Sequence, residues 1–167
     1  SFQDITATSD LDFRHSEDLF DDYIFEPLLP YKYSMMGPAL VTGDINGDGL
    51  EDFYVGGAAG QPGALFMQKR NAKFVETAGP WLEDFAQEDG AAVFSDFDND
   101  GDQDLYVVSH GNQFQDHTDR LYMNLGTGFI KVQTALPSGT TAGQAIAICD
   151  FDQDGLQDIF IGGRNTP

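Results

Sequence analysis

The sequence predicts an all-β protein built from β-propeller blades, each made of four antiparallel strands. Three observations support this fold class. The stretch GDINGDGLEDFYVGG (43–57) returns as SDFDNDGDQDLYVVS (95–109) and CDFDQDGLQDIFIGG (149–163). Aromatic and β-branched residues flank each copy, and Gly, Asn and Pro bound the flanking runs, as is typical of short strands. The copies recur roughly every 50 residues, which is the repeat length of a propeller blade.

Each repeat unit is expected to place one strand before the acidic stretch, one after it, and two more further along the chain. The first unit (about 37–89) gives strands near 39–43, 52–56, 64–68 and 73–77. The second unit (about 90–143) gives strands near 91–95, 104–108, 120–124 and 128–132. The third unit (about 144–167) gives only 145–149 and 158–162. The sequence therefore predicts a partial propeller of about two and a half blades.

Residues 1–36 precede the repeats and are expected to form an N-terminal strand followed by an extended lead-in. The strand is FQDIT (2–6), which would act as the outer strand of a neighbouring blade. SEDLFDDYIF (16–25) is the one part of the lead-in where we expect a helical turn. Because propellers need about four to eight blades to close, we expect either a fragment of a longer chain or a protomer that associates with itself through open blade edges.

Composition limits the classes of partner. The chain has 167 residues and a formal net charge of −20, from 28 acidic and 8 basic residues. Such a surface repels phosphate backbones, so we expect no nucleic-acid binding. The sequence has no run of roughly 18 apolar residues, so no membrane insertion is expected. The single cysteine, Cys149, stands in the apolar run AIAICD and is expected to be a buried, unreactive thiol.

The acidic stretches have the ligand spacing of a calcium-binding loop. Counted from the first Asp, positions 1, 3, 5 and 9 carry side-chain oxygens, position 6 is Gly, and position 7 offers a backbone carbonyl. Alternate side chains of a tightly curled loop point to its centre, so these oxygens can surround one cation. The predicted ligands are Asp44, Asn46, Asp48, Leu50 and Asp52; Asp96, Asp98, Asp100, Asp102 and Asp104; and Asp150, Asp152, Asp154, Leu156 and Asp158.

The loops differ from EF-hands, which close with a Glu at position 12. Here position 12 is Val55, Val107 or Ile161, inside an expected strand. The cation would therefore sit in a strand–loop–strand hairpin closed by the ninth-position Asp. Asp and Gly also form ordinary turns, but three copies with all five positions filled favour metal binding. Carboxylate-rich oxygen cages favour Ca²⁺ over Mg²⁺, so we expect about three Ca²⁺ ions.

These loops and strands resemble FG-GAP/VCBS repeats, which occur in integrin α-subunit propellers and in many large secreted or surface bacterial proteins. The bacterial group that carries ASPIC/UnbV regions is the most similar, because LLPYKYSMMGPALVTGDINGDGLEDFYVGGA (28–58) resembles its lead-in to a first blade. The resemblance covers roughly 37–163. It implies Ca²⁺ in one hairpin loop per blade. This chain departs from the family pattern in length, because propellers of this family are usually seven-bladed.

The resemblance implies a calcium-stabilised propeller segment of an exported or surface protein, extracellular and of bacterial type, that acts as a binding or scaffold module. The alternative is part of a calcium-containing propeller enzyme that acts on polysaccharide, with its active site outside this segment. No catalytic residue is predicted, because a metal-binding loop that recurs in every blade favours a structural role over catalysis.

The ligand of such a module, protein or glycan, is not identified by the sequence. Connections that leave the ends of the strands opposite the acidic loops are candidates for ligand contact. They contain Trp81, His110 and His117. Packing between blades is an equally good interpretation of Trp81.

Overall fold

The structure is a computed structural model that describes residues 3–111, 116–132, 136 and 142–164. Its strands form antiparallel sheets in which consecutive strands are neighbours. The first blade contains β1 (Leu40–Gly43), β2 (Asp52–Val55), β3 (Ala64–Gln68) and β4 (Phe74–Thr77). The second contains β5 (Glu88–Ser95), β6 (Asp104–His110), β7 (Arg120–Asn124) and β8 (Phe129–Val132). A third sheet pairs β9 (Ala142–Cys149) with β10 (Asp158–Arg164).

The ten strands expected in the three repeat units are all present, and the all-β class is confirmed. The hairpins β5–β6 and β9–β10 extend beyond their expected ends. A register irregularity between Asp89 and Ala91, and another between Gly162 and Gly163, lets pairing continue past the regular ladder. A β-bulge of this kind adds one residue to a strand without ending it, which is why the sequence pattern stops too early there.

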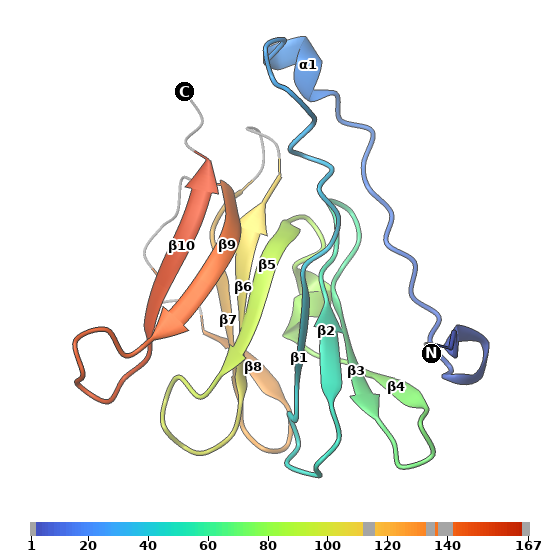
Figure 1. The fold of residues 1–167 in the computed structure, drawn as a ribbon, viewed down its shortest axis with the longest axis vertical. Helices are drawn as coiled ribbons and strands as arrows, with labels where there is room; N and C mark the ends of the chain where they lie inside the picture. The colour runs from blue at the N-terminus through green and yellow to red at the C-terminus, as the bar shows by residue number, and fades with distance from the viewer. Residues whose placement is uncertain (1–2, 112–115, 133–135, 137–141, 165–167) are drawn as a thin grey trace.

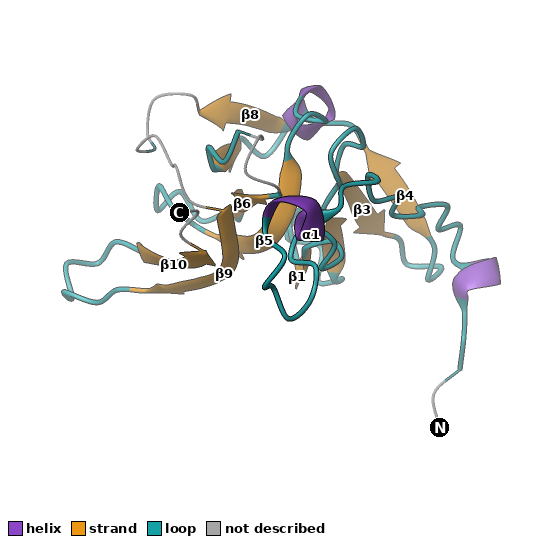
Figure 2. Ribbon diagram, turned by 90° about the horizontal axis from the view of Figure 1, so that it is seen from above, coloured by secondary structure: helices purple, strands orange, loops and turns teal. Residues whose placement is uncertain are grey.

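The three sheets are arranged like blades around a common side. Seen from above in Figure 2, the first strands β1, β5 and β9 lie inward, while β4 and β8 lie outward. Contacts between β1 and β5, and between β5 and β9, join the sheets along these inner strands. The three acidic loops leave the same end of the molecule (Figure 1). These open sheets are compatible with a partial propeller.

The main core lies between the first two blades. Tyr54 and Leu65 of the first blade meet Leu105, Val107 and Tyr122 of the second, all fully buried. A second cluster joins Tyr106 and Val108 on the opposite face of β6 to isoleucines of β9 and β10. Because β6 is buried on both faces, its sequence DLYVVSH is apolar at successive positions rather than alternating.

The N-terminal prediction is wrong for the residues that can be checked. Residue 2 lies outside the described residues, and residues 3–6 contain no strand. Instead Thr6–Thr8 form a short 3₁₀ turn, η1, which Asp4 initiates by accepting a hydrogen bond from the Thr6 N–H at 2.9 Å. This side-chain bond competes with strand formation. The chain then packs Phe13 edge-on against Phe66 of the first blade.

The lead-in contains the expected helical turn, α1 (Asp22–Phe25). Asp21 caps it by accepting a hydrogen bond from the Tyr23 N–H at 3.3 Å. The buried Asp22 carboxylate accepts hydrogen bonds from the backbone N–H and hydroxyl of Ser34. These bonds connect the turn to the chain that enters β1. No helix in the described part of the chain is long and apolar enough to span a membrane.

The expectation for Cys149 is also wrong, because its thiol is exposed. Along the end of β9, half-buried Ile146 and Ile148 alternate with exposed Ala145 and Ala147. Cys149 continues the exposed series, so the run AIAICD is apolar in composition but only one of its faces packs on the second blade.

Candidate metal centre

The three acidic loops share one backbone conformation. Position 6 is a glycine with positive φ in every loop: Gly49 at 83°, Gly101 at 96° and Gly155 at 89°. Position 4 also adopts positive φ, although its residue is Gly, Asn or Gln. The left-handed conformation is costly for residues with a Cβ, and its recurrence at Asn99 and Gln153 shows that the rest of the loop imposes it.

Carboxylates organise the loops by accepting backbone hydrogen bonds. In the second loop Asp96 accepts from the N–H groups of Asp100 and Gly101, at 3.1 and 3.0 Å. Asp98 also accepts from the Asp100 N–H, at 3.2 Å. The same bonds occur in the first and third loops. The side chains at positions 1 and 3 are therefore held on the inside of each loop.

The ninth-position Asp connects its loop to the third strand of the blade. One oxygen of Asp104 accepts from the Phe97 N–H at 2.9 Å, and the other accepts from the Asn124 N–H at the end of β7 at 2.8 Å. Asp52 makes the equivalent bonds to Ile45 and Gln68. Burial raises the pKa of both Asp52 and Asp104, and the loop carboxylates add to the shift while these backbone bonds oppose it.

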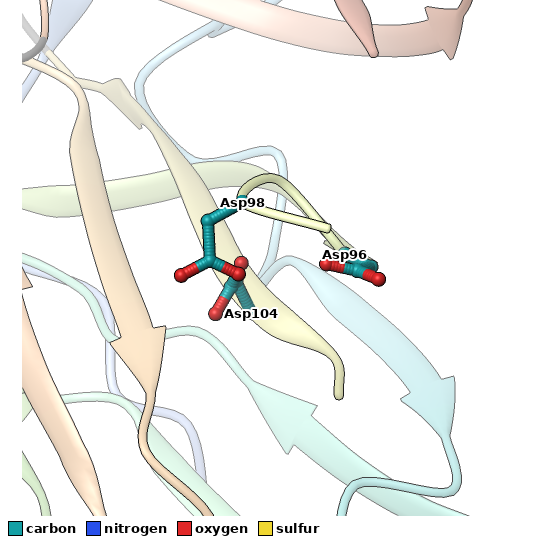
Figure 3. A group of neighbouring side chains, drawn as sticks. All are labelled: Asp96, Asp98 and Asp104. Carbon is teal, nitrogen blue, oxygen red and sulfur yellow. The ribbon is translucent and has the colours of Figure 1, made fainter. Parts of the chain in front are cut away.

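Two loops bring three carboxylates within 4.8 Å of one another. They are Asp96, Asp98 and Asp104 in the second loop, and Asp150, Asp152 and Asp158 in the third. Figure 3 shows Asp98 and Asp104 side by side and Asp96 across the loop from them. A carboxylate oxygen that accepts one hydrogen bond retains lone pairs for a cation. This donor set of oxygens alone fits a hard divalent cation.

The other predicted ligands occupy the same loops but lie outside these groups. At position 5, Asp48, Asp100 and Asp154 each accept a hydrogen bond from the N–H of position 7. In the first loop, position 3 is Asn46 rather than Asp, so its oxygens are those of Asp44, Asp48, Asp52 and an amide. The carbonyls of Leu50, Asp102 and Leu156 follow the glycine at position 6 in every loop.

Comparison with known proteins agrees with this repeat. The FG-GAP-like repeat matches residues 44–107 and again 96–161. Together the two matches cover more than half of the chain. The chain belongs to the FG-GAP-like repeat family. A search of curated proteins found no match.

Each FG-GAP-like match begins at the first Asp of one loop, Asp44 or Asp96. Each ends in the second strand of the next blade, at Val107 or Ile161. The matched unit therefore contains two consecutive acidic loops and the strands between them. Both carboxylate groups lie inside the second match.

The three residues proposed for ligand contact are buried. Trp81, in the 3₁₀ turn η2 (Pro80–Glu83), is 1% exposed and packs edge-to-face against Tyr54, Tyr122 and Phe129. His110 is 3% exposed and His117 6% exposed. Side chains so buried leave little surface for a ligand. For Trp81, packing between blades is the interpretation that holds.

His110 connects three parts of the chain. Its Nε2 lies 2.8 Å from the carbonyl oxygen of Tyr33 in the lead-in. The same atom lies 3.0 Å from the side-chain nitrogen of Gln144 in β9. His110 thus contributes to the packing of the lead-in, the second blade and β9.

Sequence reasoning missed a buried ion pair within the second blade, between β5 and β7. Arg120 Nη2 lies 2.6 Å from Asp89 Oδ1, and both side chains are 2% exposed. The other Asp89 oxygen accepts from the Tyr54 hydroxyl and the Gly57 N–H, both at 2.8 Å. Burial alone would lower the pKa of Arg120, but the charge of Asp89 raises it overall. Arginine is rare in this acidic chain, yet only the pairing of β5, β6 and β7 in one sheet reveals its partner.

Glu88, beside this pair, titrates abnormally. It is 5% exposed and opposite His110 in the β5–β6 ladder. Burial, and then the charges of Glu17, Asp18, Asp89 and Asp22, raise its pKa from 4.5 to about 8. The folded protein therefore binds more protons than the unfolded chain between these values. The stabilisation from this group is complete below about pH 4.5 and is lost as the pH rises through about 8.

Glu88→Gln should therefore remove part of the loss of stability at high pH. We expect little difference from the unmodified protein near pH 5, and a variant more stable by on the order of 2 kcal/mol at pH 8. Urea unfolding across this range, at constant calcium, measures the effect. The exposed Glu83→Gln is the control and should follow the unmodified protein. Parallel stability curves for Glu88→Gln and the unmodified protein would contradict the assignment.

Proposed function

We propose that the acidic loops bind Ca²⁺, one ion per loop, and that the chain is a calcium-stabilised β-propeller segment. The observation that carries this proposal is the grouping of Asp96, Asp98 and Asp104 within 4.8 Å, which Asp150, Asp152 and Asp158 repeat. Like charges so close repel one another unless a cation or protons compensate them. Ca²⁺ accepts a variable number of oxygen ligands, whereas Mg²⁺ demands near-ideal octahedral geometry, so these loops suit Ca²⁺ better.

The expected role of the ions is structural. Each loop joins the first two strands of its sheet, and the ninth-position Asp of the first two loops also binds the third strand. A bound ion would hold the loop in place and, through the ninth-position Asp, its connection to the third strand. At a calcium concentration about ten times the dissociation constant, each site adds about 1.4 kcal/mol to stability, so three add about 4 kcal/mol. That amount is comparable to the whole margin of a small domain.

For the protein as a whole we propose a binding or scaffold module of an exported or surface protein. The support is the FG-GAP-like repeat and the formal net charge of −20. The proposed calcium affinity of the acidic loops also suits the calcium concentration outside cells. Extracellular calcium modules bind with dissociation constants of roughly 10⁻⁴ to 10⁻³ M. Such sites would be occupied outside cells and largely empty in cytosol.

The loop assignment is tested by removing one carboxylate. Asp98→Ala should reduce the number of Ca²⁺ ions bound per chain by one, because Asp98 belongs to a three-carboxylate group. Glu51→Ala is the matched control, since it removes the same charge from an exposed position 8 that supplies no predicted ligand. Calorimetry with metal-free protein counts the sites. Unchanged stoichiometry in Asp98→Ala, or an equal loss in Glu51→Ala, would contradict the assignment.

A further inference from the structure

The first and second acidic loops are neighbours in the fold. Asp44 and Ile45 of the first loop and Asp102 and Gln103 of the second line one cavity of about 500 Å³. Asn124, the last residue of β7, lines the same cavity. A residue that is hydrogen-bonded to both loops is in a position to make binding in one loop depend on binding in the other.

Asn124 makes hydrogen bonds to both loops. Its backbone N–H donates at 2.8 Å to Asp104 Oδ1, the ninth-position carboxylate of the second loop. Its side-chain nitrogen donates at 3.1 Å to the carbonyl oxygen of Ile45, position 2 of the first loop, and at 3.3 Å to that of Gln103. A side-chain amide nitrogen carries two donors, so this one group can serve an acceptor in each loop.

The bond to Ile45 continues to a predicted ligand of the first loop. The Ile45 N–H donates at 3.1 Å to Asp52 Oδ2, the ninth-position carboxylate of that loop. Three hydrogen bonds therefore connect Asp52 with Asp104 through Ile45 and Asn124. Ile45 and Asn124 are each 4% exposed, and hydrogen bonds shielded from water are electrostatically stronger than exposed ones.

The neighbouring blades offer no second link of this kind in the part of the chain that the structure describes. Gln68 holds the position of Asn124 in the first blade, and its N–H donates to Asp52 at 2.7 Å. Its half-buried side-chain amide makes no hydrogen bond to another described residue. Phe97 holds the position of Ile45 in the second loop, and its carbonyl accepts no hydrogen bond from the described strands of the third sheet.

We propose that Asn124 couples the first and second acidic loops, so that a cation bound in one raises the affinity of the other. A cation in the second loop would hold Asp104 and, through it, the end of β7 with the Asn124 amide directed at Ile45. The first loop then loses less conformational freedom when it binds its own ion, and the same holds in reverse. The inference rests on the proposed calcium binding and adds cooperativity between two of its sites.

Calcium calorimetry on chains with selected loops emptied measures the coupling. Asp152→Ala empties the third loop and leaves two sites. On that background, Asp98→Ala leaves the first loop alone, and Asp44→Ala leaves the second loop alone. The coupling factor is the overall binding constant for two ions divided by the product of the two single-ion constants.

Asn124→Leu removes both side-chain donors but keeps the net charge and the backbone N–H that binds Asp104. We expect the coupling factor to fall by about fivefold or more, the lower end of the range for coupled sites. Repulsion between the two ions is the same with Asn or Leu at this position, so it cancels in the comparison. Asn124→Ser is a second variant in case Leu prevents folding, since its shorter side chain carries a single donor.

Gln68→Leu is the matched control, because it makes the same change at the equivalent position of the first blade; it should leave the coupling factor unchanged. A purely structural role for Asn124 would lower the single-ion constants and leave the factor as it was. An unchanged factor in both Asn124 variants, or an equal fall in Gln68→Leu, would overturn the proposal.

This inference and the proposed function can be told apart when they fail. Three calcium sites per chain, with the same coupling factor in the unmodified protein and in Asn124→Leu, would overturn the coupling alone. Absence of calcium binding in the unmodified protein would overturn the proposed function and the coupling with it.

Discussion

Arg120→Met should lower the free energy of unfolding by about 3–5 kcal/mol, because it leaves the buried Asp89 carboxylate without its cation. Asp89 and Arg120 are each 2% exposed and 2.6 Å apart. The Tyr54 hydroxyl and Gly57 N–H still reach Asp89, but they carry no positive charge to balance it. Urea unfolding at constant calcium gives the value.

A double variant separates the lost charge from lost packing. If the buried charge is the cause, Asp89→Asn combined with Arg120→Met should recover part of the stability that Arg120→Met loses. Lys73→Met is the control, since it breaks an ion pair with Asp10 whose side chains are 46% and 57% exposed; exposed pairs contribute only about 0–1 kcal/mol. A loss below about 1 kcal/mol for Arg120→Met would contradict a structural role for the pair.

Trp81→Ala should cost about 3–5 kcal/mol through loss of buried area and the cavity it leaves. The indole lies between blades, with ring centroids 6.0 Å from Tyr54, 5.8 Å from Tyr122 and 5.4 Å from Phe129. It also packs against Gly79, where an added Cβ would come within 2.3 Å of the ring. Denaturant unfolding measures the loss.

Phe85→Ala provides the comparison for Trp81, because Phe85 is a nearby aromatic residue that is 51% exposed. It should lose far less stability, since little apolar surface is withdrawn from water there. Similar losses for the two variants would mean that Trp81 does not join the blades. Near-native stability of Trp81→Ala, with loss of ligand retention, would favour the ligand contact that the sequence left open for it.

The sequence was sufficient for the features that repeat. Side-chain alternation and turn residues located the strands to within a few residues, and the spacing of Asp96, Asp98 and Asp104 placed three carboxylates in one loop. Both signals are local, since they depend on residues within one hairpin. Repetition added confidence that no single loop could supply, because an isolated acidic turn forms for many reasons.

The sequence was insufficient where the outcome depends on contacts between strands or connections that are far apart in the sequence. Nothing local distinguishes Asp89 and Arg120, 31 residues apart, from other charged residues, because their pairing requires β5 and β7 to lie on either side of β6 in one sheet. For Trp81 the sequence left ligand contact and packing between blades equally open, since its connection had no strand pattern to indicate burial. Cys149 was expected to be buried and is exposed, because an apolar run does not reveal which of its faces is covered.

Calcium titration of metal-free protein by calorimetry, with the melting temperature followed in parallel, tests the central claim most directly. The account predicts about three sites per chain, one per acidic loop. At saturation it predicts a rise in melting temperature of roughly 10 °C, since about 4 kcal/mol is distributed over a chain of this size. Absence of binding, or binding that leaves the melting temperature unchanged, would contradict the account.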